Sequence, residues 1–386
     1  MSDLLSIKGA RIFDGHDWHE HAALLVEFGH VSAIVPEAEI PANAAQVSLE
    51  GGLLVPGFID LQVNGGGGVL FNNDPSLEAI RTICAAHAPF GTTALLPTLI
   101  TDTPAVNIAA IAAGKAAAEA GVPGFLGLHL EGPHLALARK GTHDPALIRP
   151  MDDEDLSRLV AARAALPNLL VTVAAETVRP EQIAALAEAG IIVSLGHSDT
   201  DGATAAAAFA AGASMATHLF NAMSQLGNRE PGLVGSVLTH DGVHAGLIAD
   251  GIHVHPAAIE IALRAKKGSG HIFLVTDAMS QTGTDIKVLT LNGRTITRAD
   301  GALRLADGTL AGADLDMIDA VEFMHSRIGL PLEEALRMAS LYPAQAMGLE
   351  AEMGHLRPGA IASFVHLTAE RQVGATWIAG REMWRA

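Results

Sequence analysis

The chain has 386 residues, of which 49% are hydrophobic, and a formal net charge of −18. A chain of this length and hydrophobic content can bury a large core and exceeds one ordinary domain. The acidic balance argues against a nucleic-acid backbone as partner, and the single Cys84 excludes an intramolecular disulfide and fits a reducing cytoplasm.

The N-terminal segment lacks the charged-then-apolar pattern of a secretory signal, since it reads MSDLLSIKGARIFDG. No stretch reaches the roughly 18–20 uninterrupted apolar residues that a membrane span needs. We therefore expect a cytoplasmic protein with no membrane partner.

Both ends of the chain show the period-two pattern of β-hairpins. Residues 1–55 alternate short β-like runs with glycine turns, and the C-terminal region has a similar segment, SFVHLTAERQVGATWIAGREMW. We expect residues 1–55 and 355–386 to form one small β-sandwich domain together. Residues 56–354 then form the larger domain.

The larger domain alternates apolar runs with helical stretches, which is typical of βα units. Eight runs are continuously apolar, as buried parallel strands are, and eight is the number that a (β/α)8 barrel of the TIM type requires. The runs lie at 57–63, 93–98, 125–130, 169–175, 191–196, 214–219, 245–250 and 272–277. Residues 285–311 break this rhythm and predict a β excursion with Asn-Gly and Asp-Gly turns, followed by helices at 314–328 and 331–347.

Four side chains with ligand or acid–base chemistry lie at the ends of these runs. They are Glu131, His197, His218 and Asp277. Barrel strands open toward one face, so residues at their carboxyl ends meet there. One carboxylate and two imidazoles can hold a divalent metal and leave room for water, and a further Asp can move that water's proton. The pattern predicts metal-assisted hydrolysis, with Glu131, His197 and His218 as ligands and Asp277 as the catalytic acid–base.

Each of these residues also has a structural interpretation. A buried carboxylate must be paired or liganded, so Glu131 could form an ion pair inside the barrel. A single histidine in such a position is more often structural than a ligand. Asp277 could cap a following helix, since Asp is favoured there. The convergence of all four residues at strand ends favours the metal site.

Motifs along nearly the whole chain resemble those of a known family. The segments are PGFIDLQVNGGGG (56–68), HLEGPHL (129–135), KGTHDP (140–145), GHSDT (196–200), THLFNAMS (217–224), REPGLVG (229–235), ADGIHVHP (249–256), LVTDAM (274–279) and LAGADLDMI (310–318). No single segment is decisive, but their order and spacing make coincidence a poor explanation. By these segments the chain resembles the amidohydrolase superfamily and, within it, the N-acetylglucosamine-6-phosphate deacetylases.

The resemblance implies further site residues. In that family the histidine at the position of His143 contacts substrate near the scissile carbonyl, where it would stabilise the developing oxyanion. Arg229 and His253 would bind the 6-phosphate, since an arginine fork suits phosphate oxygens. For His143 and Arg229 the alternative is a surface residue without such a contact. The other implied substrate contacts are Asn221, Ala222, Leu310, Ala311 and Gly312.

The chain departs from the wider superfamily at the first strand. The usual signature there is His-x-His, two ligands of a second metal, whereas this chain has Gln62-Val63-Asn64. Amides carry no charge and are poor ligands for a transition metal. We therefore expect one divalent metal ion per subunit, zinc first, with iron, cobalt or manganese as alternatives.

The resemblance implies a homodimer that hydrolyses N-acetylglucosamine 6-phosphate to glucosamine 6-phosphate and acetate, in amino-sugar catabolism or cell-wall recycling. The first alternative is a deacetylase of another N-acetylhexosamine phosphate, or another amidohydrolase acting on an amide. A cyclic-amide enzyme would more often keep the His-x-His pair. The second alternative is a binding protein without activity, which the joint presence of the four strand-end residues argues against. His134 is left without a role.

Overall fold

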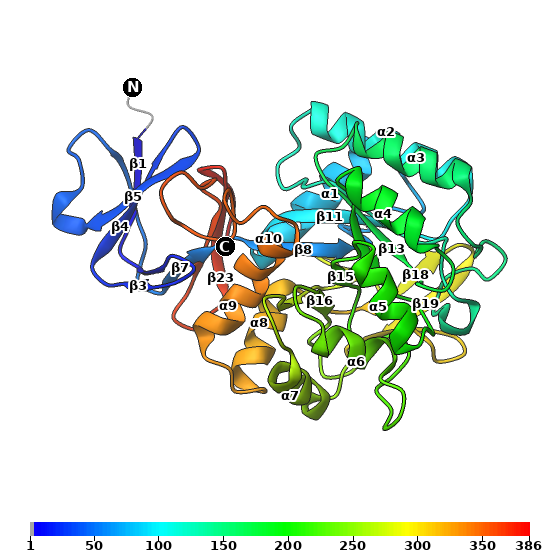
Figure 1. Ribbon diagram of the computed structural model, residues 1–386. Helices are drawn as coiled ribbons and strands as arrows, with labels where there is room; N and C mark the ends of the chain where they lie inside the picture. Colours follow the sequence, from blue (N-terminus) through cyan, green and yellow to red (C-terminus); the bar gives the residue numbers. More distant parts are fainter. Residues whose placement is uncertain (1–3) are drawn as a thin grey trace.

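The eight apolar runs form one parallel sheet in the computed structural model, which describes residues 4–386. Their order in the sheet follows the chain, as in a (β/α)8 barrel (Figure 1). The strands are β8 (Phe58–Val63), β11 (Thr92–Ile100), β12 (Leu128–Glu131), β13 (Leu169–Val173), β14 (Ile192–Leu195), β15 (Met215–Ala216), β16 (His244–Leu247) and β17 (Ile272–Leu274). The predicted barrel is confirmed, with strands that are mostly shorter than the apolar runs.

The barrel is nearly closed between its first and last strands. A single parallel bridge joins Val63 to Ala278, beyond the end of β17. On its two sides the Asp277 amide donates to the Gln62 carbonyl at 3.0 Å, and the Asn64 amide donates to the Ala278 carbonyl at 2.8 Å. This closure brings Gln62, Asn64 and Asp277 side by side at the carboxyl end of the barrel.

The Asp60 side chain strengthens the same junction deeper in the barrel. Its carboxylate accepts hydrogen bonds from the Gln62 and Thr276 amides, each at 3.2 Å, and from the Thr276 hydroxyl. Burial raises the pKa of Asp60 to about 7, although these hydrogen bonds act in the opposite direction. Hydrogen bonds to the Asp60 side chain thus take the place of backbone hydrogen bonds between β8 and β17.

Helices cover the outside of the barrel. They are α1 (Leu77–His87), α2 (Pro104–Glu119), α3 (Asp153–Arg163), α4 (Pro180–Glu188), α5 (Gly202–Ala210), α6 (Gly232–Thr239), α7 (Pro256–Ala265) and α8 (Met317–Ser326). The side chains of Ser76, Thr103, Asp152 and Asp201 cap four of them by accepting a first-turn amide. Small residues allow close packing, since a Cβ on Gly114 of α2 would lie 2.7 Å from the Leu128 side chain of β12.

The helix predicted over residues 331–347 is two helices, and the prediction is wrong in this respect. The structure has α9 (Leu332–Ala339) and α10 (Leu341–Ala346), with Ser340 in a non-helical conformation between them. Pro343 explains the break, because proline has no amide hydrogen and its ring clashes with the carbonyl four residues earlier. A proline is tolerated in the first turn of a helix, so the chain starts a new helix there.

Both chain ends contribute to a separate β-sandwich. One sheet has the order β5-β4-β1-β6 and the other the order β24-β23-β22-β7-β2-β3. The first consists of β1 (Leu4–Lys8), β4 (Ala22–Glu27), β5 (His30–Pro36) and β6 (Ala45–Ser48). The second consists of β2 (Arg11–Phe13), β3 (Trp18–His19), β7 (Leu53–Pro56), β22 (Phe364–Leu367), β23 (Val373–Ile378) and β24 (Arg381–Arg385). The pairing of C-terminal with N-terminal strands is as expected, while the domain boundaries at 55 and 355 stay a prediction.

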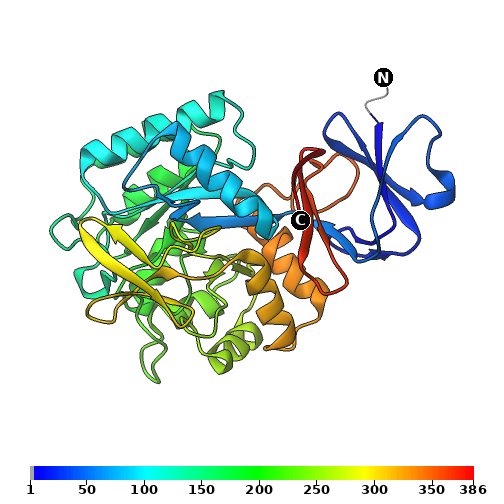
Figure 2. The ribbon, with the colours of Figure 1, turned by 180° about the vertical axis from the view of Figure 1, so that it is seen from behind.

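The six-stranded sheet lies between the four-stranded sheet and the barrel (Figures 1 and 2). Its inner face shares a core with the other sheet, in which the rings of Phe364 and Trp377 stack at 5.0 Å. On its other face Val365 belongs to the barrel core, and the Thr376 hydroxyl donates to the Ala88 carbonyl at 2.7 Å. The sandwich is therefore fixed to the barrel by buried contacts.

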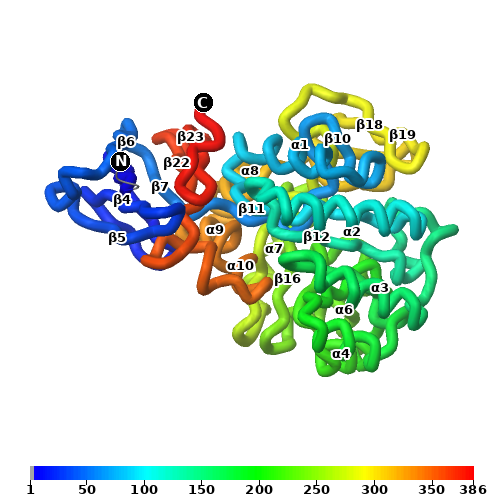
Figure 3. Tube along the Cα trace, turned by 90° about the horizontal axis from the view of Figure 1, so that it is seen from above, coloured from blue at the N-terminus to red at the C-terminus, as the bar shows by residue number. Residues whose placement is uncertain are grey.

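The β excursion forms an antiparallel sheet at the mouth of the barrel. Its strands are β18 (Val288–Leu291), β19 (Arg294–Ala299), β20 (Ala302–Leu305) and β21 (Leu310–Ala313). Figure 3 shows β18 and β19 beside β10 (Val69–Leu70) and α1. The apolar side chains of the excursion pack on Leu70, Ile100 and Met279. Among residues 4–386 no helix is long and apolar enough to cross a membrane.

Candidate active site

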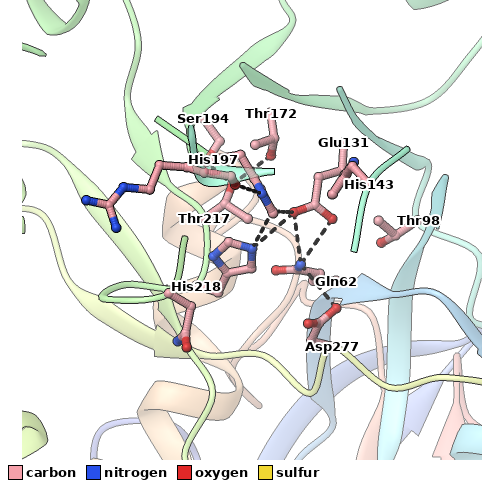
Figure 4. A network of polar contacts seen from close by, with 12 residues as sticks. Gln62, Thr98, Glu131, His143, Thr172, Ser194, His197, Thr217, His218 and Asp277 are labelled. Carbon is pink, nitrogen blue, oxygen red and sulfur yellow. Dashed lines mark hydrogen bonds and ion pairs between the residues drawn. The ribbon is translucent and has the colours of Figure 1, made fainter. Parts of the chain in front are cut away.

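The four strand-end residues singled out by the sequence converge at the carboxyl end of the barrel (Figure 4). Glu131 ends β12, and His197 and His218 each follow their strand by two residues. The Nε2 atoms of both histidines lie 3.1 Å from Glu131 Oε1, and 3.1 Å from each other. All three side chains are buried. The structure thus brings the predicted ligands together in one triangle of donor atoms.

Three of the four residues have a strained backbone. The φ angles of His197, His218 and Asp277 are 47°, 31° and 51°. Residues other than glycine rarely adopt this left-handed region, and each instance costs about 1–3 kcal/mol. The turn ends the strand and directs the side chain into the barrel mouth rather than along the sheet. Such strain is typical of functional positions.

The triangle has the size and the chemistry of a metal site. In a tetrahedral zinc site with bonds of about 2.0–2.1 Å, neighbouring donor atoms are about 3.3–3.4 Å apart. The observed separations of 3.1 Å are close to this value. One carboxylate and two imidazoles are also ligands that a divalent ion accepts. The residues present therefore fit a metal.

The hydrogen bonds of the two histidines differ. His197 Nδ1 lies 2.8 Å from the Arg139 carbonyl, so Nδ1 carries the proton and Nε2 keeps its lone pair. Metal-binding histidines usually donate their other nitrogen in this way. His218 Nδ1 is buried and finds no hydrogen-bond partner within residues 4–386. The protein fixes the tautomer of His197, and it leaves that of His218 without a fixing contact.

Two amides occupy the place of the missing His-x-His pair. Gln62 Nε2 lies 3.3 Å from Glu131 Oε2 and 3.2 Å from Asp277 Oδ1. Asn64 Nδ2 donates to the same Asp277 oxygen at 2.6 Å. Gln62 thus bridges the two carboxyls, and the amide hydrogens reduce the repulsion between them with partial charges only.

The two carboxyls have opposite pKa shifts. Burial and the nearby charge of Glu131 raise the pKa of Asp277 to about 6, against the influence of His218, His253 and Asn64. Burial also raises the pKa of Glu131, but its contacts with His197 and His218 outweigh this effect and hold that pKa well below its usual range. One group is suited to remain an anion and the other to exchange a proton near neutral pH.

His143 lies beside this triangle. One of its ligand atoms is within 4.8 Å of those of Glu131 and His197, and its ring centroid is 4.4 Å from that of His197. The side chain is buried and contacts Thr101 through Nδ1. Burial holds the pKa of His143 well below its usual value, so this imidazole is neutral. Its predicted contact with the substrate stays a prediction, and the structure places the ring beside the triangle.

A cavity of about 510 Å³ opens above the triangle. Most of the substrate contacts implied by the sequence line it: His143, Asn221, Ala222, His253, Leu310 and Gly312. Ala311 is completely buried and Arg229 is exposed outside this cavity. The substrate contacts of these two residues stay a prediction.

Comparison with known proteins assigns the family. The model of the Amidohydrolase family matches residues 53–383, and that of the NagA composite domain matches residues 7–54. The chain is 42% identical to an N-acetylgalactosamine-6-phosphate deacetylase of Shewanella sp. (strain ANA-3), over 99% of this chain and 97% of that protein.

The chain belongs to the amidohydrolase family. Within it the chain is similar to solved N-acetylglucosamine-6-phosphate deacetylases. The structure from Pasteurella multocida has a TM-score of 0.94 and 36% identity, covering 98% of this chain and 99% of that one. A Mycobacterium smegmatis variant in complex with N-acetyl-D-glucosamine-6-phosphate has a TM-score of 0.90 and 30% identity, covering 99% of both chains.

This amidohydrolase has further polar residues in the barrel that the sequence prediction missed. His129 Nε2 lies 2.7 Å from the Thr172 hydroxyl, which in turn lies 2.6 Å from that of Thr217. Burial lowers the pKa of His129 to about 4, so the ring is neutral. A signal was present, because His129 precedes Glu131 by two residues and must share its face of β12. This network forms a polar layer of the barrel interior.

Two arginines of this amidohydrolase line the cavity and were also missed. The Arg139 guanidinium donates to Asp199 at 2.7 Å. Within residues 4–386, Arg304 of β20 donates only to the Gly308 carbonyl, at 3.1 Å, and forms no ion pair. No local motif marked Arg304, since its place at the cavity depends on how the β excursion folds over the barrel. It is the more available of the two for an anion.

Proposed function

We propose that the protein hydrolyses the acetamide of an N-acetylhexosamine 6-phosphate to give acetate and the amino-sugar phosphate. The observation that carries this proposal is the buried triangle of Glu131, His197 and His218 with Asp277 beside it. This set opens into a cavity large enough for a phosphorylated sugar. The names of the similar deacetylases support the substrate class.

The glucosamine epimer is our first choice of substrate and the galactosamine epimer the alternative. Both solved structures compared above are described as acting on the glucosamine compound, whereas the relative at 42% identity carries the galactosamine name. Acetate release should be measured on both sugar phosphates with the same zinc-loaded preparation. We expect the higher kcat/KM for N-acetylglucosamine 6-phosphate, and a clear preference for the other epimer would reassign the substrate.

Zinc is the proposed ion, with Glu131, His197 and His218 as its ligands. When bound there, a divalent ion supplies Lewis acidity to the acyl oxygen and to the attacking water. The protein's part is to fix the ligands, through the Arg139 carbonyl on His197 and through Gln62 on Glu131.

We expect about one tightly bound divalent ion per chain, because amides replace the ligands of a second site at Gln62 and Asn64. Elemental analysis of protein loaded with excess zinc and then dialysed exhaustively measures the number directly. Two ions per chain, retained with equal affinity, would contradict this expectation.

Asp277 is the proposed proton carrier of the reaction. Its Oδ1 accepts from Asn64 and Gln62, which leaves Oδ2 without these contacts. As a carboxylate it takes a proton from the water that attacks the acetyl carbon, and it then passes this proton to the departing amine nitrogen. Its pKa, raised by burial, suits both transfers. His143 would donate a hydrogen bond to the acyl oxygen as negative charge develops on it.

The phosphate would be bound by His253 together with Asn221, Ala222 and arginine. The His253 side chain is only 6% exposed, and Nδ1 lies 2.6 Å from Asp250 Oδ2. Burial raises the pKa of Asp250, but the contacts from His253 outweigh it and lower that pKa. Asp250 therefore stays an anion, and its contact with Nδ1 holds the His253 ring in place. Arg304 would add a guanidinium from the same chain.

Arg229→Ala is expected to lower kcat/KM for the phosphorylated sugar. The loss should correspond to about 1.5–3 kcal/mol of transition-state stabilisation, the cost of a lost charged hydrogen bond. The loss should be small for the unphosphorylated sugar. Steady-state kinetics on both sugars test this, with Arg327→Ala, an exposed arginine at the C-terminal end of α8, as the control. Equal losses on both sugars would show that Arg229 has a structural role.

We also expect a homodimer, because Arg229 is exposed and outside the cavity of its own chain, so its phosphate contact would have to be made across a subunit interface. Light scattering at the protein concentration of the activity assay measures the association state. A fully active monomer would refute this expectation.

A further inference from the structure

We propose that Thr101 positions His143 as the imidazole tautomer that carries its proton on Nε2, and so makes it a hydrogen-bond donor to the substrate's acyl oxygen. Thr101 would then be a positioning residue, acting through His143. The inference rests on the proposed function for the identity of the acceptor. The tautomer itself follows from contacts within the chain.

Thr101 and His143 meet from separate parts of the barrel mouth. Thr101 is the first residue after β11, and His143 lies in the loop after β12, 42 residues further along the chain. The Thr101 amide nitrogen lies 3.3 Å from His143 Nδ1, and the Thr101 hydroxyl lies 2.7 Å from the same atom. The two side chains are 1% and 2% exposed, so water does not compete for these contacts.

The backbone amide decides which nitrogen carries the proton. An amide N–H can only donate, so Nδ1 must present a lone pair to it. The hydroxyl, which can donate or accept, then donates to the same atom. A proton on Nδ1 would face the Thr101 N–H, which disfavours both the other tautomer and the imidazolium. The proton of His143 is therefore on Nε2.

The chain around the Thr101 hydroxyl keeps it in place. Gly132, the residue after Glu131, has a φ of 86°, and a Cβ there would lie 2.2 Å from Thr101 Oγ1. Glycine at this position makes room for the hydroxyl. On the other side, the His143 amide donates to the Lys140 carbonyl at 3.0 Å, and the Arg294 guanidinium donates to the Thr142 carbonyl. These contacts hold both partners of the pair.

This tautomer separates His143 from the ligand histidines. His197 donates from Nδ1 and keeps the lone pair on Nε2, whereas His143 accepts at Nδ1 and has its hydrogen on Nε2. A ligand nitrogen needs a free lone pair. His143 lies close enough to Glu131 and His197 to resemble a fourth ligand. However, its Nδ1 lone pair accepts from Thr101 and its Nε2 carries a proton, so neither nitrogen is free to bind a metal. His143 can instead donate a hydrogen bond from Nε2.

The tautomer can be read without any activity assay. Two-bond ¹H–¹⁵N correlation spectra of the zinc-loaded protein, labelled with ¹⁵N in histidine, distinguish Nδ1-protonated, Nε2-protonated and doubly protonated rings. The signals of His143 are those lost in His143→Gln. We expect the Nε2-protonated pattern. An Nδ1-protonated or a doubly protonated ring would overturn the proposal, even if the enzyme proves to act on another substrate.

Kinetics test whether Thr101 acts through His143. Thr101→Val removes the hydroxyl at nearly constant volume, and we expect kcat to fall about 10-fold with little change in KM or zinc content. Thr101→Ser keeps the hydroxyl and should retain most of kcat. In a His143→Gln background Thr101→Val should cause no further loss, because its target is gone.

The outcomes distinguish this proposal from the proposed function. An equal fall of kcat for Thr101→Val in both backgrounds would show that Thr101 acts elsewhere, for example on the Glu131–Gly132 turn, and would overturn the positioning role. A wild-type protein that releases no acetate from either sugar phosphate would instead refute the function. The spectrum of His143 would still decide the tautomer.

Discussion

Asp277→Asn is expected to lower kcat by about 10²–10⁴-fold, the usual contribution of a positioned general acid–base. Asparagine has the shape of aspartate and can still contact Gln62 and Asn64, but it cannot take a proton. KM should change little, since binding of the ground state needs no base. Steady-state kinetics with zinc-replete protein give both constants.

The bound metal is the control for this variant. Glu131, His197 and His218 are unchanged, so the zinc content should equal that of the wild type. Asp307→Asn serves as a matched substitution, because this carboxylate is exposed near the cavity rim and should leave kcat unchanged. A near-normal kcat in zinc-replete Asp277→Asn would mean that another group carries the proton, with His143 the first to test.

Glu131→Gln is expected to weaken zinc binding by more than about 100-fold and to abolish activity at limiting zinc. Loss of a residue that only supports a ligand already costs about 10–100-fold in affinity, and Glu131 is itself the one anionic member of the triangle. Glutamine keeps the volume and removes the charge. Competition with a chromophoric chelator measures the affinity.

His134→Gln is the matched control for Glu131→Gln. It changes a buried residue of the same motif, three positions later, whose ring contacts the Arg149 carbonyl rather than the triangle. Its zinc affinity should remain that of the wild type. If Glu131→Gln keeps wild-type zinc affinity while thermal melting shows that it is folded, Glu131 is not a ligand.

The barrel could be predicted because its strands are buried on both faces and therefore read as continuous apolar runs. The strand-end residues followed from the same pattern, since parallel strands of a barrel end at one face. Glu131 and His197 meet for this reason, although 66 residues separate them. The strain at His197, His218 and Asp277 could not be predicted, because nothing in the local sequence requires a positive φ.

What the sequence pattern missed depends on contacts between distant segments. The partner of His143 is a backbone amide at Thr101, and every residue except proline has such an amide. Arg304 reaches the cavity only because the β excursion packs on Leu70, Ile100 and Met279. Arg229 is exposed and does not line this cavity, so its phosphate contact stays a prediction from its type and motif.

The break between α9 and α10 was a different kind of error. Apolar periodicity continues across Ser340, so the pattern favoured one helix. Pro343 is the local indication of a break, because proline is disfavoured inside a helix. It is tolerated in the first turn of a helix, and the structure shows that this turn begins at Leu341.

The central claim is that Glu131, His197, His218 and Asp277 form a metal-dependent deacetylase site for an N-acetylhexosamine 6-phosphate. The most direct measurement compares the acetate and the free amine released from N-acetylglucosamine 6-phosphate and its galactosamine epimer by metal-stripped and zinc-loaded protein. We predict equal amounts of both products, formed only with the zinc-loaded protein. Equal rates after complete removal of the metal, or no release from either sugar phosphate, would contradict the account.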